Sequence, residues 1–165
     1  MSAHSSVLAS LVVVLLGAIW LWRRQATPRG GRRGAGPTIL VDGSNVMHWN
    51  GEASSLVLAR VVAALRARGE RPHVYFDANA GYKLGKGYLG PAALGAMIGL
   101  PAQRVTVADR GTPADPLLLA HAARSRLRVL SNDRFRDWRV QFPQAARKGA
   151  IVRGDWRGGA PVLRL

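Results

Sequence analysis

Apolar runs alternate with polar, helix-forming stretches from Thr38 onward. Four runs, rich in β-branched residues, have the length of buried strands: residues 38–41, 73–76, 104–107 and 127–130. Stretches of helical character separate them: residues 54–68, 91–98 and 112–124. Repeated β-α units fold as a parallel sheet with helices on both faces. We therefore predict an α/β fold, a three-layer α/β/α sandwich with a mainly parallel central sheet.

The pattern also predicts the local ends of these elements. Ser54 or Ser55 is a suitable N-cap for the first helix, and Thr112 is one for the third. Residues 78–90 are expected to form a long loop. Residues 133–142 are expected to form a helix that ends before Pro143, and the last residues a final strand or hairpin.

A different pattern precedes this body. Residues 7–22 contain no charged side chain. The length of this run is close to the lower limit of ~17 residues for a membrane-spanning helix. Trp20 and Trp22 stand where an interfacial aromatic belt would lie, directly before Arg23 and Arg24. Positive charges after the apolar run are typical of an uncleaved anchor. We predict one transmembrane helix in residues 1–24, a single-pass membrane protein, and a C-terminal domain in the cytoplasm.

Residues 25–37 are rich in Gly, Arg and Pro and have no apolar periodicity, so they are predicted to be a flexible linker. Its arginines either contact anionic lipid headgroups or a polyanionic substrate, or belong to a solvated tether. Residues 38–165 then form the folded domain. At 48% hydrophobic content the chain can build a core.

The few acidic residues are not scattered. Only 9 residues are acidic against 24 Lys and Arg, and four aspartates each follow an apolar run: Asp42, Asp77, Asp109 and Asp133. The carboxyl ends of parallel strands share one edge of a sheet, where open α/β folds bind ligands. A single aspartate after a strand is often an ordinary N-cap or loop residue. The set as a whole favours a site for Mg²⁺ or Mn²⁺, because oxygen ligands suit these ions.

The charge balance points to a polyanionic substrate. The formal net charge is +15, and since five arginines precede Thr38, residues 38–165 carry 19 basic and 9 acidic side chains. Most basic residues are Arg, whose planar fork suits phosphate, although genomic bias can also produce such a composition. The absence of cysteine from the sequence excludes disulfides, cysteine nucleophiles and thiolate zinc sites.

Two basic segments are candidates for RNA contacts. In residues 81–88, Lys83 and Lys86 alternate with two tyrosines, a pattern typical of single-strand binders and equally of a mobile glycine loop. Arg134 and Arg136 flank the last aspartates and are the better candidates for phosphate contacts.

Two motifs carry a resemblance to a known family. Residues 41–46 read Val-Asp-Gly-Ser-Asn-Val, and residues 130–137, about 90 positions later, read Leu-Ser-Asn-Asp-Arg-Phe-Arg-Asp. Together they resemble the NYN branch of the PIN-like nucleases, notably the regnase-type ribonucleases. The resemblance covers most of residues 38–152. It implies the NYN/PIN-like fold and a metal-dependent ribonuclease activity.

The resemblance also assigns roles to residues. It implies that Asp42 and Asp133 bind the metal, that Asp115 and Asp137 complete the acidic cluster, and that Asn45 orients the site. Asp77 and Asp109 lie on the same predicted edge but outside the family motif, as possible peripheral residues. Relatives carry two adjacent acids where this chain has Ala114-Asp115. The number of metal ions therefore stays open.

We predict a membrane-anchored, metal-dependent endoribonuclease that hydrolyses the phosphodiester bonds of RNA. We expect its RNA partner to be single-stranded. Two alternatives remain: a non-catalytic RNA-binding or scaffold protein on the same fold, and another Mg²⁺ phosphohydrolase. The Asp-x-Asp-x-Thr loop of the haloacid dehalogenase type is absent from the sequence, because Gly-Ser-Asn follows Asp42. Which RNA is cut, and whether the chain forms a homodimer, stay open.

Overall fold

The computed structural model describes residues 38–165. These residues form six strands, β1 (Thr38–Asp42), β2 (Arg71–Phe76), β3 (Val105–Val107), β4 (Arg128–Leu130), β5 (Ile151–Arg157) and β6 (Ala160–Arg164). The α-helices are α2 (Gly43–Val46), α3 (Ser55–Ala67), α4 (Ala80–Lys83), α5 (Pro91–Ile98) and α6 (Asp115–Ser125). Three short 3₁₀ helices complete the described part, η1 (Ala102–Arg104), η2 (Arg136–Trp138) and η3 (Pro143–Ala146).

The strands form one mixed sheet in the order β3-β2-β1-β4-β5-β6. Strands β1 to β5 pair in parallel, and β6 pairs with β5 antiparallel as the second strand of a hairpin. The prediction of a mainly parallel sheet with a terminal hairpin is confirmed. Because β1 lies between β2 and β4, the carboxyl ends of these three strands meet at the centre of one sheet edge.

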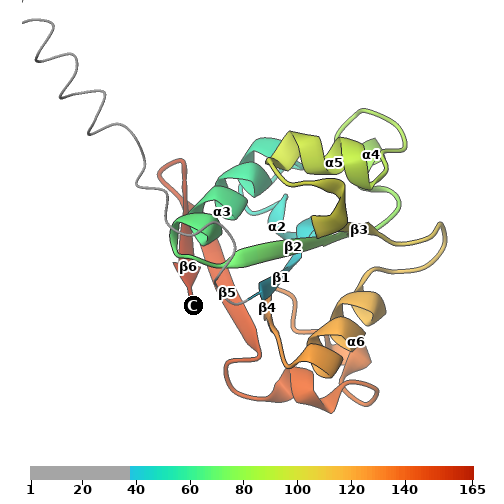
Figure 1. Cartoon of the computed structure of the whole chain (residues 1–165), viewed down its shortest axis with the longest axis vertical. Helices are drawn as coiled ribbons and strands as arrows, with labels where there is room; N and C mark the ends of the chain where they lie inside the picture. Colours follow the sequence, from blue (N-terminus) through green and yellow to red (C-terminus); the bar gives the residue numbers. More distant parts are fainter. Residues whose placement is uncertain (1–37) are drawn as a thin grey trace, which may run out of the picture. The chain divides into compact units, whose positions relative to one another are not determined.

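Helices cover both faces of the sheet (Figure 1). On one face, α3 and α5 bury a core that includes Ile39 and Val41 of β1. On the other face, α6 buries Leu40 against Leu118 and Leu119. The alternation of Ile39, Leu40 and Val41 between the two cores follows from the two-residue period of a strand. Both faces of β1 are therefore apolar, as its continuous apolar run predicts.

The predicted anchor (residues 1–24) and linker (residues 25–37) lie outside the described residues. Within residues 38–165, no helix has both the length and the apolar character that crossing a membrane requires.

The predicted helix over residues 133–142 is wrong. This segment has no regular structure up to Phe135, then forms the short η2 helix and a turn, and it reaches η3 without an α-helix. The Asp133 carboxylate accepts a hydrogen bond of 2.6 Å from the Phe135 backbone N–H, and Phe135 takes a φ of 47°. An aspartate that bonds the backbone two residues later favours a turn over a helix. Asp133 and Asp137 therefore do not share a helix face.

Two smaller predictions also need correction. Residues 78–90 are not entirely loop, because α4 occupies part of them. Thr112 does not cap α6, which begins at Asp115 with Ala114 at the N-cap position and no side-chain capping bond. Directly after β1, the chain forms the four-residue helix α2.

Candidate active site

Asp42 lies at the carboxyl end of β1, where the chain enters α2. It is buried, with 6% of its surface exposed. The next residue has to be glycine, because a Cβ at Gly43 would lie 2.6 Å from Val74 Cγ1 and 2.9 Å from the Tyr75 carbonyl oxygen. Gly43 thus lets α2 pack directly against β2 and keeps Asp42 at the centre of the sheet edge.

Both Asp42 oxygens accept hydrogen bonds. The Asn45 backbone N–H donates to Oδ1 at 3.0 Å, and the Ser131 hydroxyl donates to Oδ2 at 2.7 Å. Ser131 is fully buried and also accepts a bond of 3.0 Å from the Asp133 backbone N–H. One serine therefore connects Asp42 of the first motif to Asp133 of the second.

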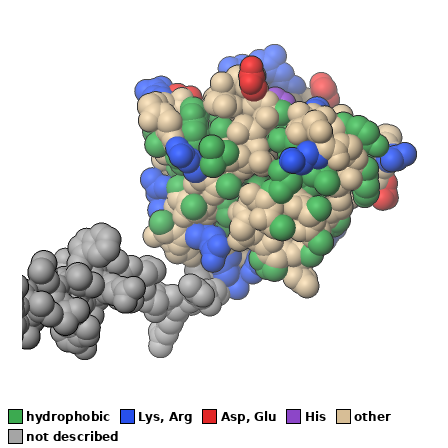
Figure 2. Space-filling model, turned by 90° about the horizontal axis from the view of Figure 1, so that it is seen from above, with side chains coloured by type: hydrophobic (Ala, Val, Ile, Leu, Met, Phe, Trp, Pro, Cys, Tyr) green, Lys and Arg blue, Asp and Glu red, His purple; other side chains and the backbone are tan. Residues whose placement is uncertain are grey.

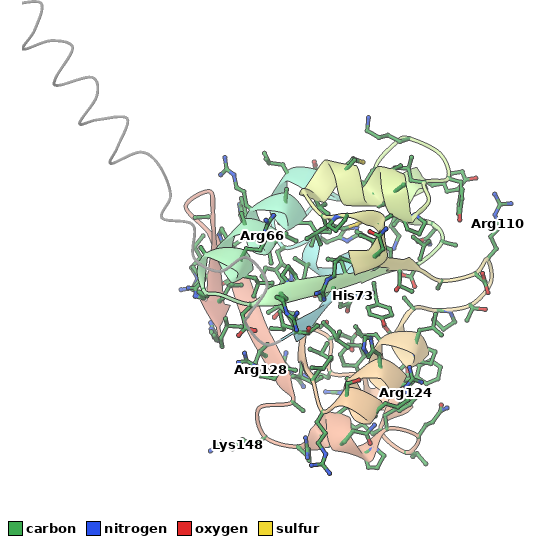
Figure 3. All side chains as sticks on the ribbon, in the orientation of Figure 1. Arg66, His73, Arg110, Arg124, Arg128 and Lys148 are labelled. Carbon is green, nitrogen blue, oxygen red and sulfur yellow. The ribbon has the colours of Figure 1, made fainter. Side chains whose placement is uncertain are left out.

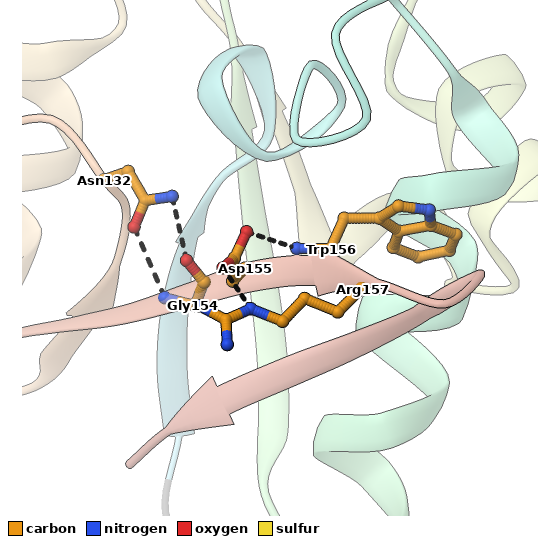
Figure 4. Close-up of polar contacts among 5 residues, drawn as sticks. All are labelled: Asn132, Gly154, Asp155, Trp156 and Arg157. Carbon is orange, nitrogen blue, oxygen red and sulfur yellow. Dashed lines mark hydrogen bonds and ion pairs between the residues drawn. The ribbon is translucent and has the colours of Figure 1, made fainter.

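Asn45 makes a second connection between the two motifs. Its Oδ1 accepts hydrogen bonds from the Trp49 indole and from the Asn132 backbone N–H, both at 3.0 Å. The Asn132 amide in turn pairs with the backbone of Gly154, donating to its carbonyl at 2.9 Å and accepting from its N–H at 3.3 Å (Figure 4). The side chains of Asn45 and Asn132 thus hold the loops after β1 and β4 against β5.

The surroundings of the Asp42 carboxyl group disfavour its charged form. Burial raises the pKa of Asp42 to about 6, the hydrogen bonds from Ser131 and Asn45 oppose this rise, and the charges of Asp115 and Asp77 add to it. A buried carboxylate that is repelled by two further carboxylates favours binding of a cation or a proton. This electrostatic environment is the strongest physical indication of a functional site at this edge.

Asp115 belongs to the same electrostatic group. It begins α6 and is half-buried, and burial raises its pKa, followed by the charges of Asp133 and Asp77. Asp137 adds to the rise, whereas the Trp138 side chain opposes it. Asp115, at the start of α6, therefore lies close enough to the acids that follow β2 and β4 for their charges to raise its pKa.

Asp77 holds the start of α6 in place. Its Oδ1 accepts a hydrogen bond of 2.9 Å from the Ala114 backbone N–H, directly before Asp115. Its own backbone N–H donates to the Ser44 hydroxyl at 2.9 Å. The residue predicted to be peripheral thus connects α2, β2 and α6.

The remaining predicted acids are more exposed. Asp133 and Asp137 are exposed in the segment around η2, and their charges act on Asp115. Asp109 is also exposed, in the connection between β3 and α6, and is not among the charges that shift the pKa of Asp42 or Asp115. The structure therefore groups Asp42, Asp77, Asp115, Asp133 and Asp137 electrostatically, without Asp109.

The chemistry of this donor set fits Mg²⁺ or Mn²⁺, because it consists of carboxylates whose mutual repulsion a divalent ion would relieve. Within residues 38–165, no three or more Asp, Glu, His or Cys side chains stand close enough together to hold a metal ion.

The basic side chains predicted to contact RNA lie on the surface of the domain. The predicted RNA contacts Arg134, Arg136, Lys83 and Lys86 are all exposed. Lys and Arg side chains are spread over the face seen in Figure 2, where acidic side chains are fewer.

Sequence reasoning missed three residues of the site. Ser131 lies inside the second motif, two residues before Asp133, and this position could have indicated that it belongs to the site. Arg153 donates to the Asn132 carbonyl at 2.9 Å. Arg110 projects from the connection between β3 and α6 (Figure 3), and no motif in the sequence marks it.

Comparison with known proteins gives a match to the fold. No family model matches the chain, and no curated protein matches it. Two solved structures of nuclear protein-only RNase P 2 (PRORP2) from Arabidopsis thaliana resemble it. One has a TM-score of 0.60 at 16% identity and covers 100% of this chain and 37% of its own. The other has a TM-score of 0.59 at 17% identity and covers 98% of this chain and 35% of its own.

This likeness concerns the fold, since identity this low carries no further information. The chain spans little more than a third of the length of those RNase P chains. The likeness shows that this chain shares its fold with part of those RNase P chains. The assignment to the NYN branch of the PIN-like nucleases stays a prediction. The particular similarity to the regnase type stays a prediction.

Proposed function

We propose that this protein is a metal-dependent endoribonuclease that hydrolyses phosphodiester bonds of RNA. The observation that carries the proposal is the environment of Asp42, a buried carboxyl group with a raised pKa that feels two further aspartates. Its position at the carboxyl end of a central parallel strand is where α/β folds place ligands. The likeness to a protein-only RNase P supports RNA as the substrate class.

We assign the metal to the carboxylates of Asp42, Asp115 and Asp133, together with Asp137. To hold a Mg²⁺ or Mn²⁺ ion, these carboxylates would have to move closer together than they are in the described structure. A bound ion of this kind supplies an activated water and neutralises charge on a phosphate. Ser131 and the Asn45 backbone orient the Asp42 carboxylate, and the Asn45 side chain keeps the two motif loops together. Asp77 positions Asp115 through the start of α6.

The exposed arginines supply the other part of the proposal. Arg134 and Arg136 stand beside Asp133, where their guanidinium groups can bind the phosphates of RNA. The protein would act at a membrane surface, held there by residues 1–24 through the linker of residues 25–37, with the domain of residues 38–165 in the cytoplasm.

The test is a cleavage time course on a labelled single-stranded RNA with the full chain in detergent. We expect cleavage with Mg²⁺ or Mn²⁺, none with EDTA, and a loss of several orders of magnitude in Asp42→Asn. Asp155→Asn is the matched control, since its exposed carboxylate pairs with Arg157 and should leave the rate unchanged. Equal cleavage by the parent chain and Asp42→Asn would refute the mechanism. RNA binding without cleavage in the parent chain would favour the non-catalytic alternative.

A further inference from the structure

A cleft opens beside the acidic group, between the segment after β2 and the connection from β3 to α6. Its volume is about 500 Å³, within the ~300–1,000 Å³ typical of ligand sites. Asp77, Asn79 and Tyr82 line one side, and Arg110 and Thr112 line the other. Asp77 lines the cleft and accepts the hydrogen bond from the Ala114 N–H, directly before Asp115, so the cleft lies next to the start of α6.

Two tyrosines and one arginine come together at this cleft. Tyr82 and Tyr88 are 55% and 51% exposed, so both offer aromatic surface to a ligand. The Arg110 guanidinium lies 5.7 Å from the centre of the Tyr88 ring and donates to the Tyr82 hydroxyl at 3.4 Å. Aromatic rings beside a guanidinium are the combination with which proteins stack a base and bind its phosphate.

The loop that presents the tyrosines is closed on itself. The Lys86 N–H donates to the Gly81 carbonyl, and the Gly85 N–H donates to the Tyr82 carbonyl, both at 2.9 Å. A Cβ at Gly81 would lie 2.2 Å from the Gly87 carbonyl oxygen, so the two ends of the loop are in close contact. Tyr82 lies in α4, and these contacts hold α4 against the loop that follows it, which lowers the entropy lost when a base stacks on the Tyr82 ring.

We propose that this cleft is a nucleotide subsite, in which one base of single-stranded RNA stacks on Tyr82 and an adjacent phosphate pairs with Arg110. The subsite rests on the proposed function in that it takes RNA as the substrate. It would hold the nucleotide adjacent to the one whose phosphate lies at the catalytic aspartates. It favours unpaired RNA because a base inside a duplex does not offer its face for stacking on a side chain.

The test is the binding of two labelled oligomers of equal length, single-stranded oligouridylate and an abasic phosphodiester chain, to the full chain in EDTA. We expect the parent protein to prefer the base-bearing oligomer by roughly tenfold. Tyr82→Ala should lose this preference, and Tyr82→Phe, which keeps the ring, should retain it. Arg110→Ala should weaken both oligomers, whereas Arg68→Ala, a matched loss of charge at the end of α3, should weaken neither as much.

The base preference and cleavage are separate measurements. If Tyr82→Ala abolishes the preference for the base-bearing oligomer, the subsite is supported, even where the parent chain does not cleave RNA. Absence of cleavage would refute only the catalytic proposal. An unchanged preference in a Tyr82→Ala protein with a normal melting curve would refute the subsite, whether or not RNA is cleaved. Failure of the parent chain to bind either oligomer would refute it as well.

Discussion

The Ser131 hydroxyl donates a 2.7 Å hydrogen bond to Asp42 Oδ2, although the two residues are separated by 89 positions in the chain. The bond is buried and joins the ends of two neighbouring parallel strands, β1 and β4. It stabilises the charged form of Asp42 against the effect of burial. A small polar residue therefore partly offsets the rise that burial causes in the pKa of Asp42.

Ser131→Ala should lower the free energy of unfolding by about 1–3 kcal/mol at pH 7, because it leaves a buried carboxylate oxygen without its donor. The loss should be smaller in an Asp42→Asn background, since the two residues are coupled. Ser125→Ala, on the exposed end of α6, should change stability little. Urea unfolding of the parent chain, the two single variants, the double variant and Ser125→Ala measures these differences. Equal losses in both backgrounds would contradict the coupling.

The pH dependence of stability should reveal the raised pKa of Asp42. Burial raises this pKa from 3.8 to about 6, so the folded protein binds the proton more tightly than the unfolded chain. This contribution to stability is present below pH 3.8 and is lost as the pH rises through about 6. Across this window, Asp42→Asn should gain about 3 kcal/mol relative to the parent chain.

Comparison with the variant is necessary because His73 acts in the opposite direction. Burial, followed by the charges of His121 and Arg104, lowers the pKa of His73 to about 4. Its contribution is therefore present above pH 6.5 and is lost as the pH falls through about 4. Melting curves of the parent chain and Asp42→Asn in EDTA, recorded from about pH 3.5 to about pH 7.5 in steps of about one pH unit, give the difference in stability between them. A constant difference would show that Asp42 titrates as an exposed acid.

Gly43→Ala should destabilise the fold by about 1–3 kcal/mol, because its Cβ would overlap Val74, Phe76 and the Tyr75 carbonyl. The matched control is Gly90→Ala, where a Cβ would meet no atom within 4 Å and φ is −83°. Thermal unfolding of both variants measures the contrast. A stable Gly43→Ala protein would mean that α2 can move away from β2.

A chain that begins at Ala35 should fold and stay in solution, because residues 38–165 supply all six strands and both apolar cores of the described structure. Circular dichroism and a cooperative melting transition test this. Loss of folding would show that the first 34 residues contribute to the core.

A reporter fused after Leu165 should be active only in its cytoplasmic form, because Arg23 and Arg24 follow the uncharged run of residues 7–22. Parallel fusions to a reporter that works only after export provide the control. Activity of the exported reporter would reverse the predicted orientation.

The sequence by itself determined the order of strands and helices and the positions of most acids. A continuous apolar run predicted a strand that is buried on both faces, because neither face of such a strand carries polar side chains to contact water. The run consists of Ile39, Leu40 and Val41. Asp42 and Asp133 were marked by their motifs. These signals are local in the chain, so periodicity and neighbouring residues were sufficient to find them.

Tertiary structure decided the rest, because it depends on contacts between distant residues. The segment after Asp133 has the composition of a helix, but its aspartate bonds the Phe135 N–H and the chain turns there. Asp77 became the residue that holds α6 through the Ala114 N–H, 37 positions away. Arg110 reached Tyr82 and Tyr88 only through the approach of two connections. Local propensity cannot encode such contacts, since their energy depends on which segments the folded sheet brings together.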